Sequence, residues 1–173
     1  KRTPGTSLQF AEERFERGSG ATLEVEQALR AGWMTEEFSL VYQPKVDARS
    51  GALIGFEALA RWNRPGLASV NPSAFIATAE RIGLIGPLGE AILVRACQQI
   101  AQWREDGVRI VPVAVNVSAL QLLDPDFPAL VQRTLQRFGL PSEALTLELT
   151  ETAAVTHIEQ ARSQIERMRA DGV

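Results

Sequence analysis

Three polar side chains interrupt apolar, strand-like runs of the sequence: Glu57, Asn116 and Glu148. A strand in these segments would otherwise present aliphatic side chains, and an unpaired carboxylate in such surroundings carries a large desolvation cost. A divalent cation would compensate for that cost. Two carboxylates and an amide oxygen are hard ligands, which suit Mg²⁺ or Mn²⁺ better than zinc or copper. The pattern therefore predicts a functional site, for which magnesium or manganese is one interpretation.

The same residues also allow an interpretation without a metal. Glu57 could pair with Arg61 on the same face of its strand, and Asn116 could hydrogen-bond to the backbone of a loop. Spacing alone leaves both interpretations open.

The elements that must position these residues alternate along the chain. Two runs rich in β-forming residues, 38–46 and 53–62, flank turn-forming residues at 47–51, which predicts an antiparallel β-hairpin. The later pattern predicts, in order, a short helix from Pro72, a helix over 87–105, a strand over 110–117, a helix ending near Gly139, a strand over 145–150 and a last helix through Met168. Such alternation indicates an α/β fold with a parallel sheet. Asn116 and Glu148 fall toward the C-terminal ends of their strands, where such folds build their sites.

Composition is consistent with one folded domain and excludes several classes of function. The 173 residues are 45% hydrophobic and 23% charged, with a net charge of -3, which gives no global electrostatic reason to bind DNA or RNA. Cys97 is the only cysteine and His157 the only histidine, so an internal disulfide and the usual structural zinc sites are excluded. No apolar run approaches the roughly 20 residues that cross a bilayer. We therefore expect a cytoplasmic location, although the parent protein could be membrane-anchored.

The first twenty residues differ from the rest of the chain. A segment dense in Glu and Arg ends at the flexible sequence Gly18-Ser19-Gly20. We interpret residues 1–20 as a linker or connector helix, and we expect a further domain upstream of it.

Four short motifs then occur in a fixed order. They are Tyr42-Gln43-Pro44-Lys45, Glu57-Ala58-Leu59-Ala60-Arg61-Trp62, Asn116-Val117-Ser118 and Glu148-Leu149-Thr150-Glu151-Thr152. Together they resemble the EAL domain, the family that hydrolyses cyclic di-GMP to the linear dinucleotide. The resemblance implies that residues 21–173 are the N-terminal part of an EAL domain.

This resemblance implies a fold and a set of site residues. The fold would be an incomplete, modified TIM (β/α)8 barrel whose first strand is antiparallel to the others, with about half of the barrel present. The metal ligands would be Glu57, Asn116 and Glu148, for a two-metal Mg²⁺ or Mn²⁺ site. Arg61 would contact a substrate phosphate, and Glu151 would organise a loop without direct chemistry. Gln43 and Leu59 would lie against the dinucleotide.

The resemblance also implies a function and partners. We expect metal-dependent hydrolysis of cyclic di-GMP to linear pGpG in bacterial signal transduction, with a homodimer and an upstream sensory or cyclase-like domain. The paired aspartates and later ligands of the family are not in these 173 residues, so we expect this piece alone to be inactive. Two alternatives from other classes remain, a cyclic di-GMP receptor module without turnover and a plain interaction scaffold.

Overall fold

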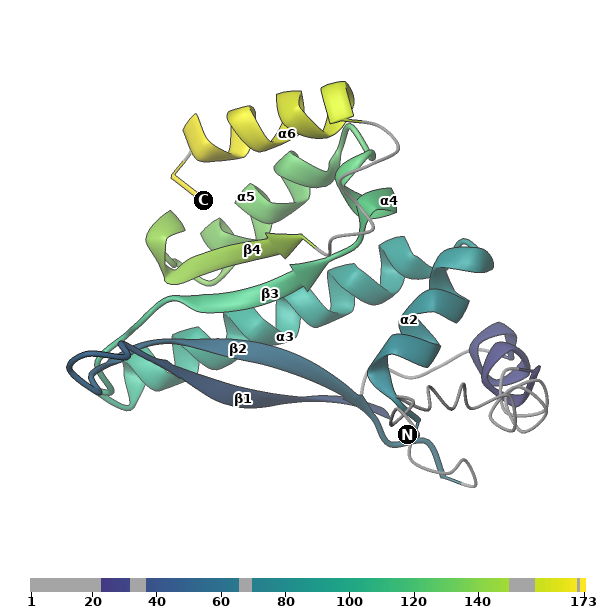
Figure 1. Cartoon of the computed structure of the whole chain (residues 1–173), viewed down its shortest axis with the longest axis horizontal. Helices are drawn as coiled ribbons and strands as arrows, with labels where there is room; N and C mark the ends of the chain where they lie inside the picture. Colours follow the sequence, from purple (N-terminus) through teal and green to yellow (C-terminus); the bar gives the residue numbers. More distant parts are fainter. Residues whose placement is uncertain (1–22, 32–36, 66–69, 150–157, 171) are drawn as a thin grey trace, which may run out of the picture.

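The structure, a computed structural model, describes residues 23–31, 37–65, 70–149, 158–170 and 172–173. Within these residues, four strands form one sheet in the order β1-β2-β3-β4, and helices pack against it (Figure 1). β1 is antiparallel to β2, whereas β2, β3 and β4 are parallel to one another. This is the mixed α/β, partial-barrel arrangement with an antiparallel first strand that the sequence predicted.

The first two strands form the predicted hairpin. β1 spans Phe38–Val46 and β2 spans Leu53–Trp62. The turn between them is organised by Asp47, whose Oδ1 accepts hydrogen bonds from the backbone N of Ser50 at 2.7 Å and from its Oγ at 2.6 Å. Gly51 adopts a φ of 69°, a left-handed conformation that glycine tolerates without steric cost.

The rest of the chain alternates helices with parallel strands. A helix at residues 23–30 precedes the hairpin. The elements after it are α2 (Pro72–Arg81), α3 (Ile85–Glu105), β3 (Val113–Val117), α4 (Ala119–Leu122), α5 (Phe127–Arg137), the 3₁₀ turn η2 (Ser142–Ala144), β4 (Leu145–Leu149) and α6 (Ile158–Ala170). The long helix α3 runs behind the sheet, and α5 contacts both α3 and α6 (Figure 1).

Two predicted boundaries differ from the structure. The strand expected from residue 110 begins at Val113, because Pro112 has no N–H to give to a sheet ladder. The helix expected from Pro87 begins two residues earlier, at Ile85. The short helix α4 was not predicted.

The two faces of the sheet differ in character, and this difference positions the site. Val113, Val115 and Val117 of β3 are at most 3% exposed and belong to the hydrophobic core. Tyr42 of β1 also belongs to this side, since its ring packs on Trp103 of α3 with 4.8 Å between ring centroids. Because strand side chains alternate between faces, the residues between these positions point to the opposite face, away from the helices.

No helix in the described ranges is long and apolar enough to cross a membrane. The predicted connector at residues 1–20 lies outside the described residues.

A candidate metal and phosphate site on the open face of the sheet

The three predicted metal ligands come from three adjacent strands. Glu57 lies in the middle of β2, and Asn116 and Glu148 are the penultimate residues of β3 and β4. Glu57 pairs with Ala114 in the parallel register, and Asn116 pairs with Glu148. Paired residues, and residues two apart on one strand, share a face. All three side chains therefore lie on the face of the sheet opposite the helices.

Glu57 and Asn116 are in direct contact. The side-chain Nδ2 of Asn116 donates a hydrogen bond to Oε1 of Glu57 at 2.7 Å. Neither of the alternatives without a metal agrees with this geometry. Asn116 bonds to a carboxylate rather than to loop backbone, and Arg61 donates from its Nη1 to the carbonyl of Ala60 at 2.9 Å.

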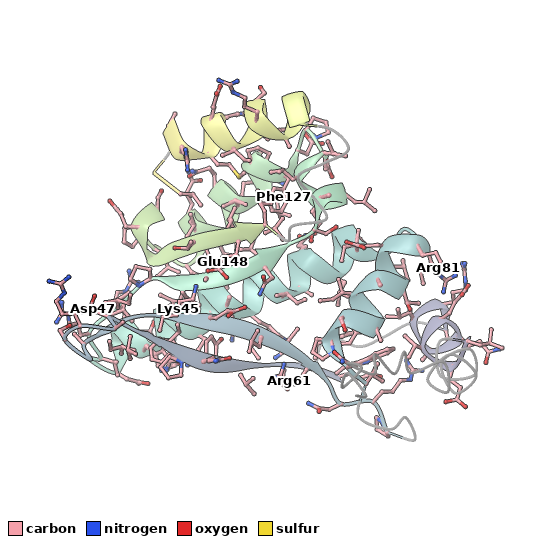
Figure 2. The ribbon with its side chains drawn as sticks, viewed as in Figure 1. Lys45, Asp47, Arg61, Arg81, Phe127 and Glu148 are labelled. Atoms are coloured by element: carbon pink, nitrogen blue, oxygen red, sulfur yellow. The ribbon has the colours of Figure 1, made fainter. Side chains whose placement is uncertain are left out.

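Glu148 has a partner that the sequence analysis missed. Nζ of Lys45 on β1 donates a hydrogen bond to Oε1 of Glu148 on β4 and forms a salt bridge with it, although 103 residues separate the two in the sequence. Figure 2 shows the two labelled side chains meeting over the sheet. Lys45 stands in the first of the four motifs, but no local pattern links it to a residue so distant in the sequence.

The other predicted site residues share this face but spread along it. Gln43 is the register partner of Glu57 across the hairpin, so the two side chains are neighbours. Leu59 and Arg61 follow Glu57 on the same face of β2 at two-residue spacing. Arg61 lies one residue before the end of its strand, well away from Lys45 and Glu148 (Figure 2). Glu151 lies outside the described residues.

A hollow of about 640 Å³ adjoins the site at the C-terminal ends of β2 and β3. Leu59 and Asn116 line it, together with apolar side chains of α2 and α3. Ser118 and Glu80 form its polar wall, where Oγ of Ser118 donates a hydrogen bond of 2.5 Å to Oε1 of Glu80. The hollow therefore places an apolar surface directly beside the candidate ligands.

Ser118 also fixes the end of β3. It is the N-cap of α4 and forms a capping box with Gln121, with its Oγ accepting from the backbone N of Leu120 at 3.2 Å. Ser118 is buried, and it follows Asn116 by two residues. This network of caps holds the segment that carries Asn116, and Glu80 ties the segment to α2. Neither Ser118 nor Glu80 had a predicted role in the site.

The donor chemistry of the cluster fits a hard divalent cation. Glu57, Asn116 and Glu148 offer only oxygen ligands, the set that Mg²⁺ and Mn²⁺ prefer. The described residues contain no group of three or more His, Cys, Asp or Glu side chains placed to hold a metal. Mg²⁺ nevertheless keeps several water ligands and needs few from protein, so two carboxylates and one amide suffice for a partial shell.

Comparison with known proteins places the chain in one family. The sequence profile of the EAL domain matches residues 24–173. The oxygen sensor protein DosP of Escherichia coli (strain K12) is 37% identical over 146 residues, which are 84% of this chain and 18% of DosP. The uncharacterized protein Rv1357c of Mycobacterium tuberculosis (strain H37Rv) is 42% identical over 79% of this chain and 45% of its own length. The chain thus spans less than half of either relative.

Solved structures resemble this fold as well. The PaMucR phosphodiesterase in complex with c-di-GMP is 37% identical with a TM-score of 0.69, and the match covers 79% of this chain and 57% of that one. The FimX EAL domain of Xanthomonas citri in complex with c-diGMP is 25% identical with a TM-score of 0.69, over 93% of this chain and 59% of that one.

Proposed function

Because the chain belongs to the EAL domain family, we propose that it carries part of a cyclic di-GMP phosphodiesterase site. The reaction is the hydrolysis of one phosphodiester bond of the cyclic dinucleotide by water, which gives linear pGpG. The PaMucR phosphodiesterase, similar in sequence and fold, binds c-di-GMP in its solved complex and supports this substrate. The observation that carries the proposal is the convergence of Glu57, Asn116 and Glu148 on one face of three adjacent strands.

In this mechanism, Glu57, Asn116 and Glu148 would hold Mg²⁺ or Mn²⁺ through their side-chain oxygens. A bound divalent ion would supply activation of the attacking water and stabilisation of the charge that develops on the phosphate oxygens. Asn116 would then present its Oδ1 instead of the Nδ2 that now contacts Glu57. Arg61 offers a planar fork that matches two phosphate oxygens, and it lies far enough along β2 to reach a different part of the dinucleotide.

The remaining proposed roles concern the substrate and partners. Gln43 lies beside Glu57 and would contact the dinucleotide, and Leu59 would pack against it at the edge of the hollow. Glu151 would organise a neighbouring loop. We also propose that the protein acts as a homodimer. Light scattering on the purified protein tests this, because a monomeric mass at working concentration would contradict it.

The decisive experiment separates turnover from binding. The full-length protein that contains these residues is incubated with cyclic di-GMP and Mg²⁺, and linear pGpG is quantified by chromatography; binding is measured separately by calorimetry in Ca²⁺. We expect Glu57→Gln to remove turnover, while Glu143→Gln, a matched change at an exposed glutamate of η2, leaves it unchanged.

Two outcomes would contradict the proposal. Binding in Ca²⁺ without turnover in Mg²⁺ by the full-length protein would favour a cyclic di-GMP receptor module instead. Turnover that survives Glu57→Gln would remove Glu57 from the ligand set.

A further inference from the structure

The contact between Lys45 and Glu148 bridges the two outer strands of the sheet. β1 and β4 are separated by β2 and β3 in the strand order, so the lysine side chain reaches across the open face to meet the carboxylate (Figure 2). Both side chains are partly shielded, with 38% of Lys45 and 35% of Glu148 exposed. A positive charge therefore already lies among the proposed metal ligands.

The register of the hairpin leaves a path for this side chain. Lys45 pairs with Gly55 on β2, and paired residues share a face. Gly55 has no side chain to block the stem of Lys45. A Cβ at Gly55 would lie only 2.8 Å from the carbonyl oxygen of Pro112, so this position has no room for one.

The choice of lysine at this position is itself informative. The chain has 18 basic residues, of which only Lys1 and Lys45 are lysines and all others are arginines. An arginine fork would hold a carboxylate by two parallel hydrogen bonds, whereas a lysine ammonium is a compact point charge on a flexible stem. A lysine can thus neutralise a carboxylate and still release it.

We propose that Lys45 is a resident cation of the site, which neutralises Glu148 in the absence of metal and is displaced when a divalent cation binds. This inference rests on the proposed metal site. Lys45 competes with the metal for Glu148, so it lowers the affinity for divalent cations. It also keeps Glu148 on the site face between binding events.

The first test measures Mn²⁺ binding by calorimetry, without nucleotide, for the wild type, Lys45→Met and Lys45→Arg. Removal of a positive charge close to a divalent ion should tighten Mn²⁺ binding by about tenfold in Lys45→Met. Lys45→Arg should bind as weakly as the wild type or more weakly. Arg49→Met is the matched control, since it removes one positive charge from an exposed position on the same hairpin and should leave the affinity unchanged.

The outcomes separate this inference from the proposed function. If the wild type binds Mn²⁺ and Lys45→Met binds no more tightly than Arg49→Met, Lys45 is not a competing cation and the inference is wrong. Weaker binding by Lys45→Met would also overturn it, because Lys45 would then only support Glu148. If neither the wild type nor any variant binds Mn²⁺, the proposed metal site itself is wrong, and this inference falls with it.

A second test needs no variant at Lys45. An amine-directed acylating reagent is applied to the wild type in EDTA and in Mn²⁺, and labelling is read from the peptide that contains Lys45 by mass spectrometry. We expect Mn²⁺ to increase Lys45 labelling several-fold and to leave Lys1 unchanged. Glu148→Gln should give high Lys45 labelling even in EDTA. Labelling of Lys45 that does not respond to Mn²⁺ in a wild type that binds the metal would contradict its displacement.

Discussion

The side-chain amide of Asn116 donates a 2.7 Å hydrogen bond to the carboxylate of Glu57, although 59 residues separate them in the sequence. The contact crosses from β3 to β2 and joins two of the proposed ligands without the help of a metal. An amide beside a carboxylate keeps the two oxygen donors close without the repulsion that a second carboxylate would bring.

The first prediction concerns Asn116. Asn116→Ala should lower Mn²⁺ affinity by at least about tenfold, the usual scale for losing a ligand or its partner at a metal site. The fold should persist, because Asn116 is exposed. Calorimetry gives the affinity and circular dichroism the fold. Asn63→Ala is the matched control: it removes an asparagine whose Nδ2 donates to Oγ of Ser39 at 2.8 Å, at the far end of β2. Equal Mn²⁺ affinity in both variants would exclude Asn116 as a ligand.

The second prediction concerns the cap at the end of β3. Ser118→Ala removes both the N-cap of α4 and the partner of Glu80. We expect the free energy of unfolding to fall by about 1–2 kcal/mol, measured by urea denaturation. Ser163→Ala, on the exposed surface of α6, should be neutral or slightly stabilising. A Ser118→Ala protein as stable as the wild type would mean that this network contributes nothing.

The third prediction concerns Gly55. Gly55→Ala would place its Cβ 2.8 Å from the Pro112 carbonyl oxygen, a backbone atom that cannot move aside easily. We expect a loss of about 1–3 kcal/mol of stability from this overpacking. Gly86→Ala is the matched control, because it lies in the first turn of α3 and its Cβ meets nothing within 4 Å. Urea denaturation should show a lower free energy of unfolding for Gly55→Ala and a higher one for Gly86→Ala, because alanine stabilises a helical position that has room for its Cβ.

The fourth prediction concerns pH. Burial raises the pKa of the Cys97 thiol to about 12 from an ordinary value of 9.0. The folded state therefore favours the protonated thiol, and this contribution to stability is complete below pH 9 and is lost as the pH rises toward 12. Burial also raises the pKa of Tyr42 to about 12. This second group contributes to the pH dependence of stability in the wild type and in every variant that keeps Tyr42.

Cys97→Ala isolates the thiol. Urea denaturation between pH 8 and pH 11 should show a shallower loss of stability in Cys97→Ala than in the wild type. A thiol reagent such as dithionitrobenzoate should react with Cys97 only under unfolding conditions, because the side chain is completely buried. Identical pH profiles for the two proteins would contradict the raised pKa.

Much of the fold followed from local patterns. The hairpin was predicted because the turn residues from Asp47 to Gly51 stand between two β-rich runs, and the structure confirms the antiparallel pairing. The predicted helix from Pro72 begins directly after Asn71, whose Oδ1 accepts a hydrogen bond from the backbone N of Ser73 at 3.1 Å, as an N-cap side chain does. Such signals lie within a few residues of the elements that they specify.

Two features were not predicted: a helix that is too short to show a periodic pattern, and a contact between residues that are far apart in the sequence. The helix α4 has four residues, too few to show a helical period, although the spacing of Ser118 and Gln121 was a visible capping-box signal. The contact between Lys45 and Glu148 depends on the order of strands in the sheet, which no local pattern encodes. The assignment of Glu57, Asn116 and Glu148 as ligands stays a prediction until metal binding is measured.

The proposed metal ligands and Lys45 come from four different strands: Lys45 from β1, Glu57 from β2, Asn116 from β3 and Glu148 from β4. A slip of any strand by one residue would turn its side chain to the opposite face of the sheet. The cluster thus exists only when all four strands are paired in their native register, so folding of the sheet and formation of the site are one cooperative event. A divalent cation that binds there would slow amide hydrogen exchange along all four strands together.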